Sequence, residues 1–288
     1  FAQIENLIPT PNEYRNAASA PGHNYYQQQA DYKMDLVLED HTQILRGTET
    51  ITYTNNSPDV LEYLWLQLDQ NLFSRTSDSK LITVEKMEDF RSLNQIERKL
   101  FDYDGGFKIE EVKATNGEDL SYAINKTMLR IDLKQALKTN GSISFNIKWW
   151  YNVNDRMAVG GRSGYEYFEE EDNYIYTIAQ FFPRMCVYDD VSGWQNKQFL
   201  GRGEFTLPFG NYDVSLTVPG DHVVSATGTI QNESTVLSPT QRKRLQKARK
   251  SDSPVFIVTQ EEAEKAEKSK VKSLKTWRFK ASNVRDFA

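Results

Sequence analysis

Apolar and polar residues alternate with a period of two along most of this chain, and this alternation limits the fold more than any other feature. It is clear in 142–151, where every second residue is apolar: Ile143, Phe145, Ile147 and Trp149. A strand presents successive side chains to opposite faces, so this spacing predicts strands with one buried face. The chain has 288 residues, 12% of them aromatic, which is long enough for one large all-β domain or two smaller ones.

The first strands are predicted to form an antiparallel hairpin. Alternation begins at Gln29, a turn falls at 39–42, and a second strand, 44–54, ends on the turn residues 55–58. A third strand, 62–69, is apolar on both faces, so we expect both faces to be covered. Short strands continue along the chain at 107–114, 121–125, 128–133, 142–151, 174–182, 203–209, 212–218, 223–230, 254–258 and 274–281.

These strands predict an all-β fold, built as a large twisted, mostly antiparallel sheet or as a sandwich. Residues 1–28, rich in Pro, Asn and Gln, are expected to be an extended arm, and 29–288 to be one β domain. Between the strands, 71–78 and the glycine-containing 152–173 are interpreted as loops, and 92–101 as a short helix.

A small, charged helical insertion is predicted near 238–268. Ser238 is a typical N-cap and Pro239 a typical first helical residue, and Thr259 begins a capping box that opens a second helix. The first helix is basic, which fits either an anionic partner or a solvated insertion at the sheet edge. Because it offers only two residues to an apolar stripe, its composition favours the solvated insertion.

Composition excludes several classes of partner. The formal net charge is −5, whereas a nucleic-acid surface needs a net basic stripe. No stretch of roughly 18 apolar residues is present, so no membrane-spanning helix is predicted. Cys186 is the single cysteine, which excludes an intrachain disulfide and is interpreted as a buried, unreactive thiol. The start, Phe1-Ala2-Gln3, is either the stub left by signal-peptide removal, which predicts a periplasmic or secreted protein, or the point where a longer chain was cut.

No catalytic or metal-binding motif is present in the sequence. The three histidines, His23, His41 and His222, lie far apart and form no H-E-x-x-H, so we expect no zinc site and interpret them as surface turn residues. The acidic run 169–172 is interpreted as solvated surface rather than as a metal site. A nucleophile elbow, a phosphate loop and a dinucleotide fingerprint are also absent. The motifs therefore predict an accessory or binding domain with no catalytic residue of its own.

Three stretches, in order, resemble the amino-terminal β domain of the aminopeptidase N family of zinc metallopeptidases. Residues 25–73 resemble its entry strands, in which an alternating strand, a turn, a G-x-x-x-I/V-x-Y-x-N strand and a Leu-rich strand follow one another. Residues 178–232 resemble the segment in which an F-P pair and acidic residues precede a Y-x-V strand pair ending in S-x-G. Residues 275–288 resemble the strand that leads into the catalytic domain. The sequence around Tyr188-Asp189-Asp190 is similar to that of the large bacterial members of the family.

The resemblance implies that a catalytic domain is absent from this chain. In the family, the zinc-binding H-E-x-x-H and the substrate-holding G-x-M-E-N strand lie beyond the β domain, and neither occurs here. A zinc peptidase needs three protein ligands and an open position for water, so the fragment is expected to be inactive and to carry no cofactor. The resemblance places zinc in the missing catalytic domain of the same polypeptide. The resemblance therefore makes the catalytic domain the expected partner of this chain. It also implies that the peptide substrate binds at the interface between the two domains.

One residue is a tentative substrate contact under this resemblance. In the family, a Gln or Glu of the β domain helps to recognise the free α-amine of the substrate, and Gln180 matches best. An amide at a domain seam can accept from an ammonium without adding a charge. The alternative is a glutamine that closes a strand end, because the family at large places its Gln further ahead of the F-P pair. Gly160, Gly161 and Arg162 are weaker candidates for a loop at the same edge.

Two further hypotheses remain open at this point. The first is that the 180–182 segment, the 160–168 loop and the terminal Phe287 and Ala288 lie on one side of the sheet and expose apolar surface for a partner domain. The second is a different function, a free-standing β-sandwich that binds glycan or protein. The aromatic residues available to such a module are Trp149, Trp150, Tyr151 and those of 165–168.

Overall fold

The predicted hairpin forms the centre of the largest sheet. In the computed structural model, which describes residues 11–82, 103–203, 206–271 and 273–288, β1 (Gln29–Glu39) pairs antiparallel with β2 (Ile44–Thr54) along its whole length. Short turn residues at 40–43 join the two strands. The alternation that predicted this hairpin buries every second residue of β1, from Ala30 to Leu38.

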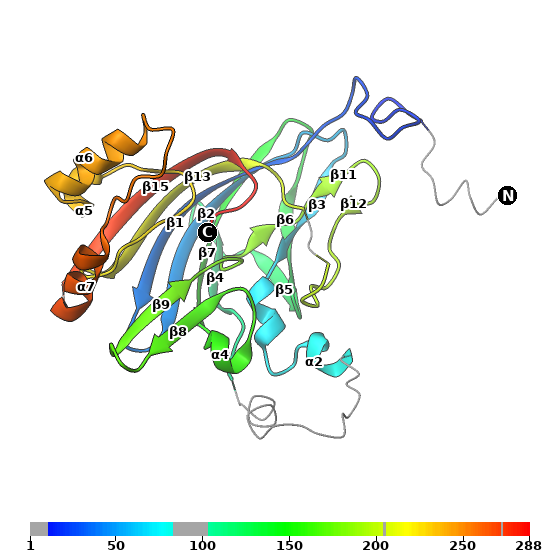
Figure 1. The fold of residues 1–288 in the computed structure, drawn as a ribbon. Helices are drawn as coiled ribbons and strands as arrows, with labels where there is room; N and C mark the ends of the chain where they lie inside the picture. The colour runs from blue at the N-terminus through cyan, green and yellow to red at the C-terminus, as the bar shows by residue number, and fades with distance from the viewer. Residues whose placement is uncertain (1–10, 83–102, 204–205, 272) are drawn as a thin grey trace, which may run out of the picture.

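Within the described residues, this sheet has seven strands and curves strongly (Figure 1). Its order is β14 (Thr229–Ile230), β15 (Leu274–Val284), β13 (Gly210–Pro219), β1, β2, β7 (Ser142–Asn152) and β4 (Lys108–Ala114). All neighbours are antiparallel except β1 and β13. The prediction of an all-β fold with a large, mostly antiparallel sheet is confirmed.

A second sheet packs on one face of the first. It has the order β10 (Arg184–Met185), β3 (Leu61–Gln67), β6 (Met128–Leu137) and β5 (Ser121–Asn125). Two small two-stranded pairs complete the strands of the described residues: β8 (Gly164–Phe168) with β9 (Asn173–Thr177), and β11 (Tyr188–Asp189) with β12 (Gly193–Trp194).

The core lies between the two sheets and is built from one face of each large strand. Side chains of β1, β2, β3, β6, β7, β13 and β15 join a single apolar cluster. Close packing requires a glycine at one point, because a Cβ on Gly47 would lie 2.3 Å from the indole of Trp149, its partner on β7. The opposite face of the sheet is hydroxyl-rich, with Thr52 bonded to Ser144 at 2.8 Å. Both faces of the third strand were expected to be covered, but Tyr63 and Trp65 are only half-buried.

The helices are short and mostly peripheral. Those among the described residues are η1 (Asp69–Phe73), α2 (Asp78–Ile82), α4 (Arg156–Val159), α5 (Glu233–Val236), α6 (Pro239–Ala248) and α7 (Gln260–Ser269). The N-cap predicted at Ser238 and the capping box predicted at Thr259 are both formed, and Ser238 also takes part in a capping box with Gln241. Neither α6 nor α7 has a buried residue, and Figure 1 shows both beside the β15 edge. The interpretation as a solvated insertion fits this placement.

Several predicted local structures are wrong. Residues 206–208 and 254–258 are irregular instead of strands, and 223–228 adds no strand before β14. Pro254 cannot donate to a ladder, and Phe256 is 82% exposed, so neither residue takes part in a sheet. Residues 152–173 contain α4 and β8 rather than one loop, and 71–78 begins within η1. The helix predicted at 92–101 lies outside the described residues.

Residues 11–28 are irregular, and Figure 1 shows the beginning of this segment extending away from the sheets. One ion pair ties this segment to the domain. Arg15 binds the carboxylate of Asp190 through two nitrogens, at 2.8 and 2.9 Å. Burial opposes charge on the Arg15 guanidinium, but its hydrogen bond to Asp190 outweighs that and raises its pKa.

Candidate functional site

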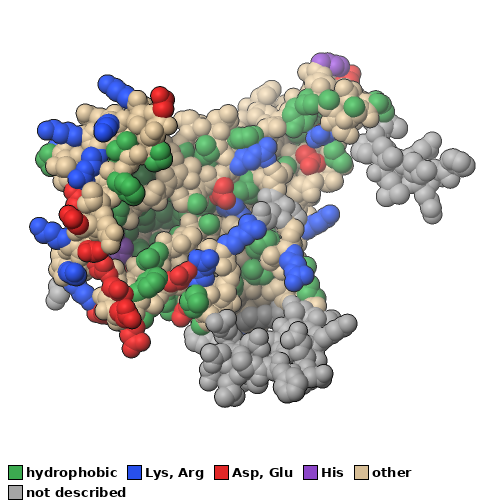
Figure 2. All heavy atoms as spheres, in the orientation of Figure 1, with side chains coloured by type: hydrophobic (Ala, Val, Ile, Leu, Met, Phe, Trp, Pro, Cys, Tyr) green, Lys and Arg blue, Asp and Glu red, His purple; other side chains and the backbone are tan. Residues whose placement is uncertain are grey.

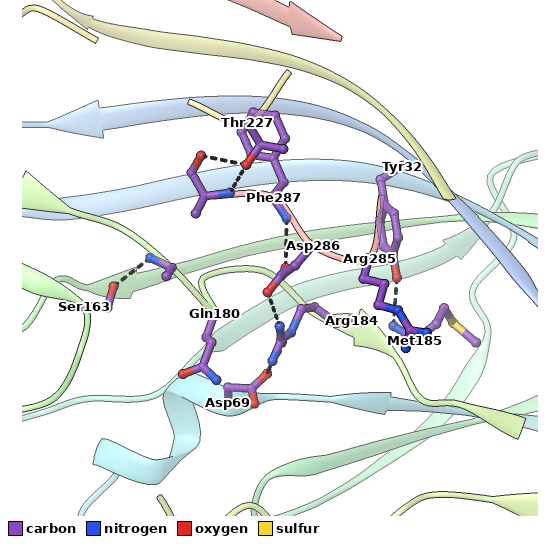
Figure 3. Close-up of polar contacts among 12 residues, drawn as sticks. Tyr32, Asp69, Ser163, Gln180, Arg184, Met185, Thr227, Arg285, Asp286 and Phe287 are labelled. Carbon is purple, nitrogen blue, oxygen red and sulfur yellow. Dashed lines mark hydrogen bonds and ion pairs between the residues drawn. The ribbon is translucent and has the colours of Figure 1, made fainter. Parts of the chain in front are cut away.

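A buried arginine joins three segments that are far apart in the sequence. Arg184 donates through Nη2 to Asp69 at 2.8 Å and through Nη1 to Asp286 at 2.6 Å, as Figure 3 shows. Asp69 begins η1, Arg184 belongs to the segment after the F-P pair, and Asp286 follows β15. A guanidinium presents donors in a fixed fork and can therefore hold two carboxylates at once. The cluster sets the relative position of these three segments.

The electrostatics of this cluster are those of a largely dehydrated site. The side chains of Arg184 and Asp69 are 6% and 2% exposed, whereas that of Asp286 is 38% exposed. Burial raises the pKa of Asp69 and of Asp286, and the Arg184 guanidinium opposes both shifts. A buried carboxylate needs such a partner, because an unpaired buried charge is strongly unfavourable.

Gln180 lies at the edge of this cluster. Its backbone is in the left-handed region, with φ of 53°. Gln180 lies beyond β9, which ends at Thr177, so the strand predicted for 174–182 is shorter than expected. The backbone oxygen of Gln180 accepts from Gln70 at 3.0 Å. The side-chain amide is half-buried, makes no hydrogen bond with any described residue, and points toward η1 near Asp69 (Figure 3). Gln180 therefore offers a free amide beside a charged cluster, and its assignment to a substrate amine stays a prediction.

The weaker candidates Gly160, Gly161 and Arg162 lie next to this segment. Ser163 follows them and joins the two regions: its Oγ donates to the Thr177 oxygen and accepts from the Ala179 amide, both at 3.0 Å. The loop also packs on η1, because a Cβ on Gly161 would lie 2.8 Å from the ring of Phe73. The structure thus brings the 160–162 loop and the Gln180 segment together, although their roles remain predictions.

The segment after β15 turns back over the inner face of the large sheet. Phe287 stacks on Tyr212 with ring centroids 5.9 Å apart, and Phe182 packs on Tyr32, the neighbour of Tyr212, at 5.2 Å. The terminal segment and the F-P segment therefore lie on the same side of the sheet, as expected. Ala288 is held by the backbone of Thr227 at 2.9 Å.

The expected exposed apolar surface is not formed by these segments. Phe181, Phe182 and Phe287 are 2%, 0% and 3% exposed, because the two sheets and the returning segment enclose them. Two exposed aromatic residues lie instead on the β8–β9 hairpin, where Tyr167 and Phe168 are 45% and 41% exposed, and two more, Tyr122 and Phe256, lie elsewhere. Two of the aromatic residues considered for a glycan- or protein-binding surface at 149–151 are not available for binding. Trp149 and Tyr151 are 1% exposed and belong to the core.

The structure corrects the interpretation of one histidine. His23 and His41 are exposed as expected, but His222 lies between two carboxylates. Its Nδ1 is 3.0 Å from Asp221 and its Nε2 is 3.6 Å from Asp40. Asp40 also accepts from the Tyr176 hydroxyl at 2.8 Å. Periodicity gives no sign of this cluster; the repeated Asp-His pairs, 40–41 and 221–222, were the available signal.

The side chains of the described residues do not suit a metal ion. No group of three or more His, Cys, Asp or Glu among them is arranged to hold one, and the ring nitrogens of His222 face carboxylates rather than an open position. The acidic run 169–172 is exposed, in agreement with its interpretation as solvated surface. Cys186 is buried, and burial raises the pKa of its thiol, which fits an unreactive cysteine. No helix in the described part of the chain is long and apolar enough to span a membrane.

Sequence analysis missed the Arg184 cluster and the contacts of His222. The strand expected at 62–69 includes Asp69, and the resemblance assigns no role to Arg184. The available signal was a charged residue inside an otherwise apolar stretch, as in Phe-Phe-Pro-Arg-Met-Cys. Such a residue is rarely buried unless it is paired, but the sequence cannot tell which carboxylate it meets.

Comparison with known proteins returns solved structures of zinc metallopeptidases. An M1 zinc metallopeptidase from Deinococcus radiodurans is 10% identical, with a TM-score of 0.43 over 92% of this chain and 41% of that chain. A mutant of the M1 zinc metallopeptidase from the same organism, bound to a Tyr-Ser-Ala substrate, is 11% identical, with a TM-score of 0.41 over 91% of this chain and 40% of that chain. The chain thus spans about 40% of the length of these proteins. No protein-family model and no curated protein matches the chain.

These structures belong to zinc metallopeptidases, the class that the sequence resembles. At such low identity and TM-score, the similarity carries no information on activity. The function therefore has to be argued from the residues of this chain and their contacts.

Proposed function

We propose that this chain is the amino-terminal, non-catalytic β domain of a zinc-dependent aminopeptidase-like metallopeptidase. One observation carries the proposal. The three stretches that resemble the aminopeptidase N family, 25–73, 178–232 and 275–288, meet in the Arg184 cluster, to which each contributes one charged residue. Such a cluster suits a domain in which the segment that leads to the next domain must keep a fixed position relative to a substrate-binding edge.

In this proposal the domain packs against a catalytic domain of the same bacterial polypeptide and shapes access to its cleft. Zinc belongs to that catalytic domain, because the described residues of this chain offer no suitable ligand group. Gln180 lies at the seam and accepts a hydrogen bond from the α-amine of the peptide substrate. Its free amide and its position beside η1 support this role. The localisation that accompanies the proposal is periplasmic or secreted.

The proposal is tested by extending the chain. Finding H-E-x-x-H within roughly the next two hundred residues of the open reading frame would support it, since domains run to that size. The extended protein is expected to contain zinc by elemental analysis and to hydrolyse an aminoacyl p-nitroanilide. An open reading frame that stops close to Ala288 would overturn it.

Gln180→Ala in the extended protein tests the contact itself. Loss of a hydrogen bond to a charged group corresponds to a KM increase of about tenfold or more, with a smaller change in kcat. Gln246→Ala, at an exposed position of α6, is the matched control and should leave KM unchanged. An unchanged KM in Gln180→Ala would remove Gln180 from the proposal while leaving the domain assignment in place.

A second function has one observation in its favour. The β8–β9 hairpin exposes Tyr167, Phe168 and Ile175, which could serve a free-standing module that binds glycan or protein. The sequence of the open reading frame beyond Ala288 also distinguishes the two functions, because a free-standing module requires no catalytic domain there.

A further inference from the structure

The short helix η1 is held to the body of the domain on both sides of Gln70. Asp69, the residue before it, accepts from Arg184 at 2.8 Å. Asn71, the residue after it, donates to the backbone oxygen of Lys126 at 2.7 Å. Asp69 and Gln70 are each 3% exposed. Because its neighbours are fixed in this way, Gln70 is a fixed point to which another segment can be attached.

The side chain of Gln70 holds the residue that is the candidate for the substrate contact. Its Nε2 donates to the backbone oxygen of Gln180 at 3.0 Å, and a longer contact of 3.5 Å reaches the oxygen of Ala179. A buried amide donor needs an acceptor, because an unpaired one is unfavourable. Here the acceptor belongs to a residue outside every strand. The bond therefore ties Gln180 directly to η1.

The backbone of Gln180 has a conformation that its surroundings must maintain. Its φ of 53° lies in the left-handed region, which is unfavourable for a residue with a Cβ and persists where neighbouring contacts determine it. The amide of Ala179, the residue before it, donates to Ser163 at 3.0 Å. Phe181 and Phe182, the residues after it, are buried in the core. The bond from η1 supplies a contact with Gln180 itself.

This backbone conformation sets the direction in which the Gln180 side chain leaves the chain, since Cβ is bonded to Cα. The side chain is half-buried and lies near Asp69 (Figure 3), and no other described residue binds its amide. The β8–β9 hairpin and the end of the chain lie on the face that Figures 1 and 2 show, which is hollowed beside the large sheet. The position of the free amide at this edge therefore depends on the backbone that carries it.

We propose that Gln70 is a positioning residue for the substrate contact at Gln180. The role rests on the proposed function, because the contact with the α-amine of a peptide belongs to that function. Gln70 is buried and acts through Gln180: it fixes the carbonyl of Gln180 and thereby the direction of the Gln180 side chain. An amide that is already in place loses less conformational freedom when the ammonium binds. Loss of the bond should therefore weaken substrate binding rather than slow the reaction of bound substrate.

Gln70→Met in the extended protein tests this role. Methionine is similar in length and volume but has no N–H, so it removes the bond to Gln180 with little change in packing. KM is expected to rise by about threefold to tenfold, with kcat nearly unchanged. Gln28→Met is the matched control, because Gln28 is also 3% exposed and its amide donates to Asn55 at 3.0 Å. It should lower the melting temperature and leave KM unchanged.

A double-mutant cycle separates positioning from a general structural role. If Gln70 acts through Gln180, Gln70→Met should change KM no further in a protein that already carries Gln180→Ala. If the two residues act independently, the two increases in KM should multiply. Multiplied effects, or an unchanged KM in Gln70→Met, would overturn the proposal.

A second measurement uses this chain alone and needs no substrate. The backbone carbon chemical shifts of Gln180 report whether it keeps its left-handed conformation. Gln70→Met should move these shifts away from the parent values, whereas Gln28→Met should not. Unchanged Gln180 shifts in Gln70→Met would contradict the positioning role. If Gln70→Met fails to fold, Gln70→Asn provides the same test, because its amide is one methylene shorter.

The outcomes distinguish this role from the proposed function. An extended protein that contains no zinc and hydrolyses no aminoacyl p-nitroanilide would overturn both. In an active extended protein, a KM that rises in Gln180→Ala but not in Gln70→Met would overturn the positioning role alone. An unchanged KM in Gln180→Ala would remove the contact and the positioning role and leave the domain assignment in place.

Discussion

Arg184 and Asp286 are 102 positions apart in the sequence, and their side chains lie 2.6 Å apart in the fold. The same guanidinium holds Asp69 at 2.8 Å. Arg184→Met is therefore expected to destabilise the domain by about 3–5 kcal/mol, because it leaves a buried carboxylate without a partner. Urea unfolding measures this change. Arg278→Met, on the exposed side of β15, is the control and should cost less than about 0.5 kcal/mol.

The two carboxylates of this cluster should not contribute equally. Asp286 is 38% exposed and Asp69 is 2% exposed, so water compensates more of the loss of Asp286. Asp286→Asn is expected to cost about 1 kcal/mol or less, and Asp69→Asn clearly more. Equal effects in thermal unfolding would show that the cluster is not dehydrated at Asp69.

Glu49 is a second buried group with a measurable consequence. The register places it between Met34 and Ile147 in the core, and neither carboxyl oxygen has a hydrogen-bond partner among the described residues. Burial raises its pKa well above the ordinary value, an effect that the nearby Trp149 indole partly opposes. The folded state therefore holds a proton that the unfolded state releases, and the stability of the domain falls as pH rises above the ordinary pKa of a glutamate.

Glu49→Gln removes this dependence. The variant is expected to be more stable than the parent by about 1–3 kcal/mol at pH 7 and nearly equal to it at pH 4. Glu62→Gln, at an exposed position of β3, should show neither effect. Chemical unfolding at the two pH values makes the comparison, and a gain of equal size at both would point to packing instead of titration.

The α6 insertion should be dispensable for folding. Deleting 239–250 with a short linker is expected to leave one cooperative thermal transition, since α6 has no buried residue. Leu237 lies just before it, is 7% exposed, and belongs to the core. Leu237→Ala should cost about 2–5 kcal/mol. Loss of the cooperative transition in the deletion would mean that the half-buried Leu245 holds the insertion more firmly than its exposure indicates.

The cap of α7 should matter only locally. Thr259 accepts from the Glu262 amide and completes a capping box. Thr259→Ala is expected to weaken the helix by about 1 kcal/mol, which hydrogen exchange detects as faster exchange in 260–269. Thr259→Ser keeps the hydroxyl and should exchange like the parent.

The chain alone is expected to bind no stoichiometric zinc and to show no aminopeptidase activity. The reason is that three ligands and an open position are required, and the described residues provide no such group. Elemental analysis of the purified chain checks the first point and an aminoacyl p-nitroanilide the second. One tightly bound zinc per chain would contradict the interpretation.

Local signals in the sequence predicted most of the strands, the N-cap at Ser238 and the capping box at Thr259. The alternation in 29–54 and 142–151 depends on neighbours along the chain, so it could be interpreted without knowing the fold. The same method failed at 206–208 and 254–258, where alternating apolar residues find no neighbouring strand. It also placed the end of β9 too late, because the apolar residues Ile178, Phe181 and Phe182 continue the pattern beyond Thr177, where the strand ends.

The sequence by itself determined the strand periodicity, the helix caps, the absence of a zinc motif and the candidate Gln180. Only the tertiary structure decided which carboxylates meet Arg184, that His222 lies between Asp40 and Asp221, and that Phe287 is buried. The physical reason is range. Periodicity and caps arise from interactions within a few residues, whereas the contacts of Arg184 with Asp69 and Asp286, and of His222 with Asp40, join segments more than a hundred residues apart. Their geometry depends on the path of the whole chain through two sheets.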